Sequence, residues 1–493
     1  MQRMQASSRF ESLVSDWLRG RPEPELQRPL TSLGDGEVTA ELARIERNRA
    51  RDAAREADLI LRLAELRPDT DDPPPGSRGG RSRTWRRTDP EFPGVSEFFP
   101  DEVALALNLG RGTAAFRARR AYTWRDNLPA TFAALHCGEI DERRAGVLAD
   151  ALQHTTPDLA RAVEAGLLPE AGDLSPARLR ARALELLAEL DATAMDERRR
   201  QAQRAADVRA YGTGDGMASL TTDMTADEAA ACYDVIDQLA TMAKADGDPR
   251  PIGEIRSSIH SMLILRPADS GLPGVTVDLS VTAALDGLEG SSARGGEVNG
   301  FPVTAAHLRE LLRRLGALGL TTPEGGSLTV AITDQNGQLL AALSAAELDR
   351  RATRGCPEHS DADGQTGADC RCPVLDAPPA TDAYEPTAAQ RRFVKTRDRR
   401  CRFPNCGQRV GWADLDHVVE HARGGATACS NLCCACRSHH RLKTFARGWV
   451  FRMDADGTLH VTSPSGITRT TRPPGLRPPE PPPHIPADDP PPF

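Results

Sequence analysis

The strongest constraint on how this chain can fold lies between Cys401 and Thr444, where metal ligands and a candidate base are concentrated in under a tenth of its length. Nine of its eleven cysteines fall between Cys356 and Cys436. The N-terminus has no apolar stretch of the secretory kind. In such a chain, clustered cysteines are more typical of metal sites than of disulfides. The segment reads CRFPNCGQRVGWADLDHVVEHARGGATACSNLCCACRSHHRLKT.

Two pairs of residues in this segment have the spacing of tetrahedral zinc ligands. Cys401 and Cys406 are separated by four residues, and Cys436 and His439 by two at a predicted helix start. Four such ligands would form a closed structural site that contributes on the order of 10 kcal/mol to folding. Cys433 also forms a CxxC pair with Cys436, so it stays an alternative ligand. Unliganded thiols are the competing interpretation.

Asp416 and His417 end a short predicted strand and are candidates for chemistry. A carboxylate suits a hard cation such as Mg²⁺, and an imidazole with an ordinary pKa of about 6.5 can take a proton from water. Asn431 follows a Gly-Gly turn, where its amide could hold the loop or ligate a metal. The next helix presents His439 and His440 on different sides. One would complete the zinc site and the other would reach the catalytic metal.

This pattern resembles that of the HNH (ββα-metal) nucleases over about residues 388–450. The resemblance implies two strands and a helix, with His417 activating water against a DNA phosphodiester. Asp416 and His440 would hold Mg²⁺ or Mn²⁺, and Asn431 would be the central asparagine. The alternative is a catalytically decayed, zinc-stabilised DNA-binding protein. The matching residues are Asp416-His417, Gly424-Gly425, Asn431-Leu432 and Cys436-x2-His439-His440-x2-Lys443.

Two features depart from that pattern. Glu420-His421 stands where related modules often carry proline, and His421 is open to three readings: a ligand, a proton shuttle or a loop residue. Cys429, Cys433 and Cys434 are additional thiols near the metal helix. They bear on the zinc assignment more than on the catalytic one.

The longer chain resembles a high-GC bacterial family, sometimes called the thirteen-E-twelve repeat family, over most of residues 95–450. That family joins a helical domain of unknown function to a C-terminal HNH module. The resemblance implies a domain layout and leaves the role of the helical domain open. The matching lines are DEVALALNLGRGTAAFRARRAYTWRDNLPATFAALHCGEI, DGMASLTTDMTADEAAA and DAYEPTAAQRRFVKTRDRRCRFPNC.

Hydrophobic spacing predicts a mainly α chain with small β hairpins, an α+β protein. Residues 101–126 have helix-turn-helix spacing, and an ordinary helical hairpin of a bundle is the competing interpretation. The predicted layout is a helical segment (1–67), a disordered linker (68–94), a helical domain with hairpins (95–350), a Cys-rich loop and linker (351–384), the HNH domain with its structural zinc (385–466) and a Pro-rich disordered tail (467–493).

A second group of metal-ligand types precedes the HNH segment. Three thiols and one imidazole, in a loop rich in Gly and Asp, could form a second zinc site. Their spacing is less typical than paired CxxC motifs, so unliganded loop cysteines are the alternative. The four residues are Cys356, His359, Cys370 and Cys372.

Charge distinguishes residues 385–470 from the rest of the chain. Residues 385–470 carry a net charge of +8, while the remainder carries −16. A basic module on an acidic body fits a DNA partner, although solvated surface is the plain alternative. No apolar run approaches the roughly 18 residues of a membrane helix, so no membrane contact and a cytoplasmic location are expected. The candidate phosphate-binding cations on a helix begun near Pro386 are Arg391, Arg392, Lys395 and Arg399.

Overall fold

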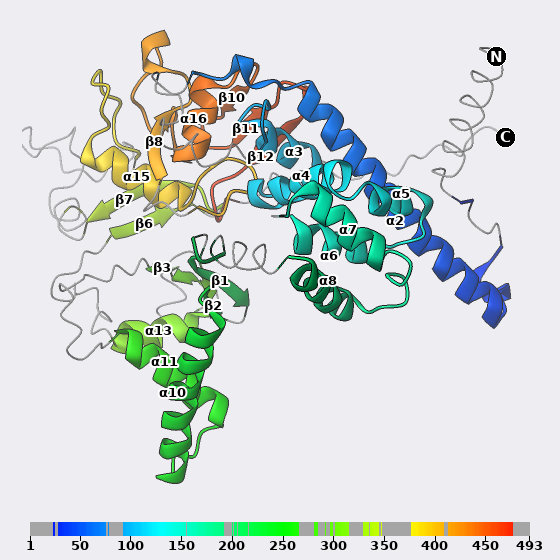
Figure 1. Ribbon diagram of the computed structural model, residues 1–493. Helices are drawn as coiled ribbons and strands as arrows, with labels where there is room; N and C mark the ends of the chain where they lie inside the picture. Colours follow the sequence, from blue (N-terminus) through cyan, green and yellow to red (C-terminus); the bar gives the residue numbers. More distant parts are fainter. Residues whose placement is uncertain are drawn as a thin grey trace, which may run out of the picture. The chain divides into compact units, whose positions relative to one another are not determined.

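The computed structural model of the chain contains helices and small antiparallel sheets (Figure 1). This agrees with the mixed composition predicted from hydrophobic spacing. No helix among the described residues has both the length and the apolar character needed to cross a bilayer. The described residues are 23–24, 28–74, 77, 92–153, 155–191, 200, 202–204, 206–214, 216–265, 281–283, 291, 296–298, 301–314, 329–334, 336–344, 347, 376–408 and 413–476.

The chain divides into two compact units. One combines Met1–Leu190 with Gly319–Phe493, and the other is Asp191–Leu318. The division therefore falls inside the range 95–350, which the sequence analysis treats as one domain. The helices before residue 190 pack into the same unit as the C-terminal segment, and residue spacing alone carries no sign of that packing.

The N-terminal part of the first unit is a layer of helices around one long helix, α2 (Asp35–Glu65). Alanines dominate the buried face of α2, among them Ala50, Ala54 and Ala57, and small side chains allow neighbouring helices to approach closely. The helices that follow are α3 (Phe99–Leu107), α4 (Arg111–Asp126), α5 (Pro129–Cys137), α6 (Glu142–Leu152), α7 (Pro157–Leu167) and α8 (Pro176–Leu190).

The arginines of α4 are engaged within the helical layer. Arg117 pairs with Glu56 of α2 at 2.7 Å, and Arg120 pairs with Asp150 of α6 at 2.7 Å. Asn108 ends α3 in the left-handed region, with φ 57°, before α4 begins. These contacts favour the helical-hairpin interpretation of residues 101–126 over a DNA-reading motif.

The C-terminal part of the first unit is built around a two-stranded antiparallel sheet. Asp416 lies opposite Cys433 and His417 opposite Leu432 in this sheet. A capping box between Thr387 and Gln390 starts α15, the helix that precedes this sheet in the chain. The elements are β6 (Thr329–Thr333), β7 (Leu339–Ser344), α15 (Ala388–Asp398), β8 (Ala413–His417), β9 (Leu432–Cys436), α16 (Arg437–Phe445), β10 (Val450–Met453), β11 (Leu459–Thr462) and β12 (Thr468–Thr471).

A buried charge cluster ties the end of α15 to β9. Asp398 accepts hydrogen bonds from Arg397 (2.7 Å), Arg402 (3.0 Å) and the backbone N–H of Cys434 (2.8 Å). Arg397 also donates to the carbonyl oxygen of Leu432 at 2.6 Å. Because the guanidinium groups and the carboxylate are all buried, their mutual pairing is what makes their burial tolerable.

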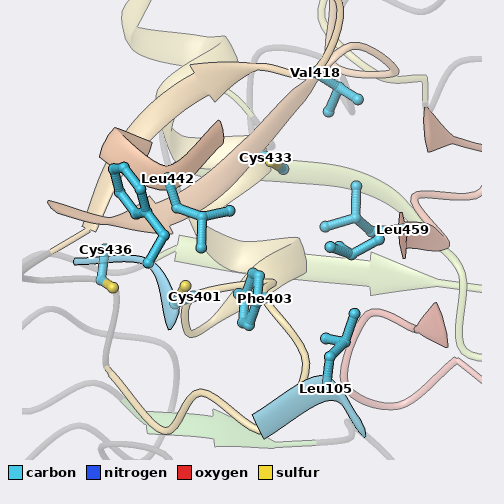
Figure 2. Packing of buried hydrophobic residues seen from close by; sticks show 10 residues of the cluster. Leu105, Cys401, Phe403, Val418, Cys433, Cys436, Leu442 and Leu459 are labelled. Carbon is cyan, nitrogen blue, oxygen red and sulfur yellow. The ribbon is translucent and has the colours of Figure 1, made fainter. Parts of the chain in front are cut away.

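Residues of α3 complete the hydrophobic core of the C-terminal part. Phe98 and Leu105 belong to the same buried cluster as Phe403, Leu442 and Leu459. Figure 2 shows Leu105 beside Phe403 and Leu459. This core therefore contains residues that are some 300 positions apart in the chain.

The second unit contains a hairpin and a pair of helices that agree with the sequence pattern. A capping box between Thr225 and Glu228 starts the first of these helices. The helices pack through Ala240, Ile255 and Ile259. The elements are β1 (Val208–Gly214), β2 (Met217–Thr222), α10 (Ala226–Ala245), α11 (Ile252–Leu265), β3 (Val281–Ala283), β4 (Gly296–Val298), β5 (Phe301–Val303) and α13 (Ala305–Arg314).

Candidate metal centre and active site

The four predicted zinc ligands lie together in the first unit. One ligand atom from each lies within 4.8 Å of all the others. The Nδ1 atom of His439 is 3.1 Å from the sulfur of Cys436 and 3.4 Å from that of Cys401. With Zn–S bonds of about 2.3 Å and Zn–N bonds of about 2.0 Å, ligand atoms on a tetrahedron lie roughly 3.5 Å apart. The cluster, completed by Cys406, could hold a metal ion such as zinc.

Local structure explains why these side chains meet. Asn405 adopts φ 57°, and the Cys406 N–H donates to the carbonyl oxygen of Phe403 at 3.1 Å, which closes a tight turn between the first two thiols. Cys436 ends β9 and is the N-cap of α16, so His439 follows one helical turn later. The ring of Phe403 stacks on that of His439 with centroids 3.9 Å apart.

Electrostatics in the cluster favour an anionic sulfur at Cys436, whereas hydrogen bonds with Cys406 and Cys436, together with burial, raise the pKa of Cys401. Hydrogen bonds from the thiols of Cys401 and Cys406 lower the pKa of Cys436 well below its ordinary value. Burial lowers the pKa of His439, but hydrogen bonds with Asp101, Cys406 and Cys436 outweigh burial and raise it well above the usual value. A metal ion must therefore displace a proton from His439. We expect the affinity of the cluster for a metal ion to fall as the pH falls.

Cys433, the alternative ligand, is not part of this cluster. It is the second residue of β9, lies opposite Asp416 and packs in the apolar core. Burial raises its pKa to about 12, and burial likewise raises the pKa of Cys429 to about 11. These additional thiols behave as small apolar core residues, which removes the ambiguity that the CxxC spacing creates.

A second group of candidate residues gathers where β8 meets α16. The Nε2 atom of His440 is 3.6 Å from Oδ1 of Asp416, and its Nδ1 is 3.4 Å from Oδ2 of Asp414. The ammonium of Lys443 lies 3.2 Å from Oδ2 of Asp416 and donates to the carbonyl oxygen of His417 at 2.7 Å. His439 and His440 thus face different groups, as the sequence predicts.

The carboxylate of Asp416 has features of a cation ligand. Its Oδ2 atom is buried, and the ammonium of Lys443 lies 3.2 Å from it. Burial raises its pKa, and the positive charges of Lys443 and His440 oppose that rise. The other carboxylate oxygen, Oδ1, lies 3.6 Å from the Nε2 atom of His440, and a carboxylate oxygen beside an imidazole nitrogen could serve as a ligand pair for a divalent cation.

His417 is held by its neighbours at the end of β8. Its Nε2 atom is 2.8 Å from the hydroxyl of Thr427, and the ring of Tyr384 stacks on it with centroids 5.4 Å apart. His421 contacts both rings edge-on from a short 3₁₀ turn, His421–Arg423. Burial lowers the pKa of His417, partly opposed by Asp416. Burial therefore favours the neutral form of the imidazole.

Asn431 holds the loop between β8 and β9. Its Oδ1 accepts from the N–H of Val419 at 2.8 Å, and its Nδ2 donates to the carbonyl oxygens of Val419 (3.0 Å) and Ala426 (2.9 Å). A Cβ at Gly425 would lie 1.9 Å from the Val419 oxygen, so this close approach requires glycine. Of the two roles open to Asn431, the contacts favour loop closure over metal ligation.

An open pocket of about 330 Å³ lies against His417. Its lining includes Arg391 and Lys395 from α15, together with Asp414 and Tyr384. This pocket combines a candidate base with two cations. A phosphate group placed there would meet both kinds of group.

The four predicted phosphate-binding cations separate into two pairs. Arg391 and Lys395 line the pocket. Arg392 instead donates to the carbonyl oxygen of Ala342 at 3.1 Å and pairs with Glu347, which anchors α15 on β7. Arg399 is the C-cap of α15 in the left-handed region. Helical spacing places residues on faces but does not say which face is covered.

The second cysteine cluster (Cys356, His359, Cys370 and Cys372) lies outside the described residues.

Comparison with known proteins gives a family match without an assigned activity. Residues 39–257 match the family described as a domain of unknown function, DUF222. The uncharacterized protein Rv3776 of Mycobacterium tuberculosis (strain ATCC 25618 / H37Rv) is 46% identical over 85 residues, which cover 17% of this chain and 16% of that protein. The uncharacterized protein MT2160 of strain CDC 1551 / Oshkosh is also 46% identical over 85 residues, covering 17% and 15%. The similarity thus spans less than a fifth of these relatives, and no solved structure matches.

Proposed function

We propose that this protein is a divalent-metal-dependent endonuclease of the HNH (ββα-metal) type that hydrolyses DNA phosphodiester bonds. The observation that carries the proposal is the meeting of Asp416, His417 and His440 at the junction of β8 and α16, next to a pocket with two cations. The strand–strand–helix order of β8, β9 and α16 supports it.

His417 would act as the general base. When its Nε2 donates to Thr427, its Nδ1 carries the lone pair, and no described residue hydrogen-bonds to that nitrogen. Nδ1 would take a proton from a water molecule as the water oxygen attacks phosphorus and the bond to the leaving oxygen breaks. Thr427 would hold the ring in the orientation that this transfer needs.

Asp416 and His440 would hold the divalent ion, which supplies electrostatic stabilisation of the charge developing on the phosphate and the leaving oxygen. Arg391 and Lys395 would bind the phosphate in the pocket. The net charge of +8 on residues 385–470 supports DNA as the polyanionic partner.

The test is nicking of supercoiled plasmid by the full chain with Mg²⁺ or Mn²⁺. We expect cleavage by the wild type and a loss of at least about 100-fold in His417→Ala, the range for removal of a general base. The matched control is His460→Ala, because His460 lies in the separate sheet β10–β12 and pairs with Asp454 at 2.8 Å. Equal cleavage by wild type and His417→Ala would refute the proposal.

A DNA-binding protein without activity is the second candidate, and one contact favours it. The ammonium of Lys443 lies 3.2 Å from Asp416 and competes with a divalent ion for that carboxylate. DNA binding at high affinity without cleavage in either metal would support this second candidate. Metal-dependent nicking that His417→Ala abolishes would exclude it.

A further inference from the structure

His439, the histidine of the candidate metal cluster, makes a second contact through its Nε2 atom. While Nδ1 of His439 faces the thiols, its Nε2 lies 3.1 Å from Oδ1 of Asp101. Asp101 is in α3, 338 residues earlier in the chain, and only 1% of its surface is exposed. Arg111 lies 3.5 Å from its second carboxylate oxygen.

This arrangement has a known physical effect at metal sites. A carboxylate that accepts a hydrogen bond from one imidazole nitrogen fixes the tautomer and the ring orientation, and it makes the other nitrogen a better ligand. Loss of such a partner typically weakens metal binding by about 10–100-fold. Burying Asp101 is unfavourable unless it is paired, so its contact with His439 stabilises both groups.

Other contacts hold α3 in place beside the metal-binding loop. Glu97, just before α3, accepts from Arg441 of α16 at 2.9 and 3.0 Å. Asn108, just after it, accepts from Asn405 at 3.0 Å. Arg469 of β12 donates to the carbonyl oxygen of Leu105 at 3.0 Å. Asp101 therefore reaches His439 from a helix that is itself anchored on both sides.

We propose that Asp101 is a positioning residue for His439, so that the metal centre is assembled jointly by the region that matches DUF222 and the C-terminal segment. Metal binding and the docking of α3 are then thermodynamically coupled, and each strengthens the other by the same factor. The proposal does not rest on nuclease activity, because it concerns the Cys401–His439 centre alone.

The first test is zinc affinity of the full chain, measured by competition with a chromophoric chelator. We expect binding about 10–100-fold weaker in Asp101→Ala. Asp101→Asn, which keeps the shape and an acceptor oxygen, should fall between that variant and the wild type. The matched control is Glu97→Gln, which keeps an acceptor oxygen for Arg441 at the same interface and touches no ligand, and it should bind zinc within about twofold of the wild type.

Two results would overturn the proposal. One is zinc affinity in Asp101→Asn and Asp101→Ala within twofold of the wild type. The other is an equal loss in Glu97→Gln, which would assign the effect to the interface in general. Far-UV circular dichroism shows whether each variant is folded. If Asp101→Ala is unfolded, the zinc affinity of Asp101→Asn decides the outcome.

Hydrogen exchange tests the coupling from the opposite side. Removing zinc with a chelator should increase amide exchange in α3, because its partner His439 loses its fixed orientation. Exchange in α7, which packs on α5 and α8, should stay unchanged and serves as the internal control. Unchanged exchange in α3 on zinc removal would contradict the coupling.

Discussion

Replacing Asp398 by alanine should destabilise the region around β9 by about 4 kcal/mol. The carboxylate is fully buried and pairs with Arg397 and Arg402, which are themselves 6% and 3% exposed. Removing one partner of a buried ion pair costs about 3–5 kcal/mol, and the unpaired N–H of Cys434 adds about 1–3. The carbonyl partners that both arginines keep, such as Leu432 for Arg397, offset part of this loss.

The assay is hydrogen exchange of β9 amides in the full, zinc-loaded chain, which reports local stability where a single unfolding transition is not expected. A loss of about 4 kcal/mol accelerates exchange roughly 1,000-fold, since each 1.4 kcal/mol is tenfold. The control is Glu385→Ala, which removes an exposed pair with Arg391 at 3.3 Å and should change exchange about twofold at most. An increase below about tenfold in Asp398→Ala would refute the reasoning.

Three further predictions concern the two candidate centres. Thr427→Val should lower the rate of plasmid nicking about tenfold or more. Thr427→Ser keeps the hydroxyl that contacts His417 and should retain most of the activity. Full activity in Thr427→Val would exclude an orienting role for Thr427. Cys436→Ser should remove bound zinc, measured by elemental analysis after dialysis, whereas Cys433→Ser should keep it, and the reverse result would reassign the ligand. Arg391→Gln and Lys395→Gln should each reduce the slope of log affinity for duplex DNA against log salt by about 0.9, and an unchanged slope would place these cations outside the DNA contact.

Local features of this protein could be predicted from its sequence because short-range rules govern them. The spacing of Cys401, Cys406, Cys436 and His439 predicts one cluster, and the structure brings these four residues together. The capping boxes and the hairpins also follow from residues within a few positions of one another. Adjacent residues on a helix point in different directions, which is why the separation of the two histidines on α16 could be foreseen.

Contacts between distant segments could not be predicted in the same way. Asp101 belongs to an ordinary helix start, and nothing near it in the sequence indicates a metal site 338 residues later. Residue spacing does not single out Thr427, because a hydroxyl in a loop has no distinguishing pattern. The different placements of Arg391 and Arg392 depend on β7 covering one side of α15. These features need the tertiary arrangement.

The neighbouring positions of His439 and His440 have a mechanical consequence. Successive residues on an α-helix are about 100° apart around its axis. Contacts of His439 with the thiol cluster and with the ring of Phe403 restrict rotation and sliding of α16. The same restriction fixes the direction in which His440 points toward Asp416. A larger thiophilic ion such as Cd²⁺ would lengthen the bonds to the thiols and would shift the start of α16. The thiol cluster thus helps to set the position of His440 relative to Asp416. The radius of the ion in the cluster would change that position without any substitution.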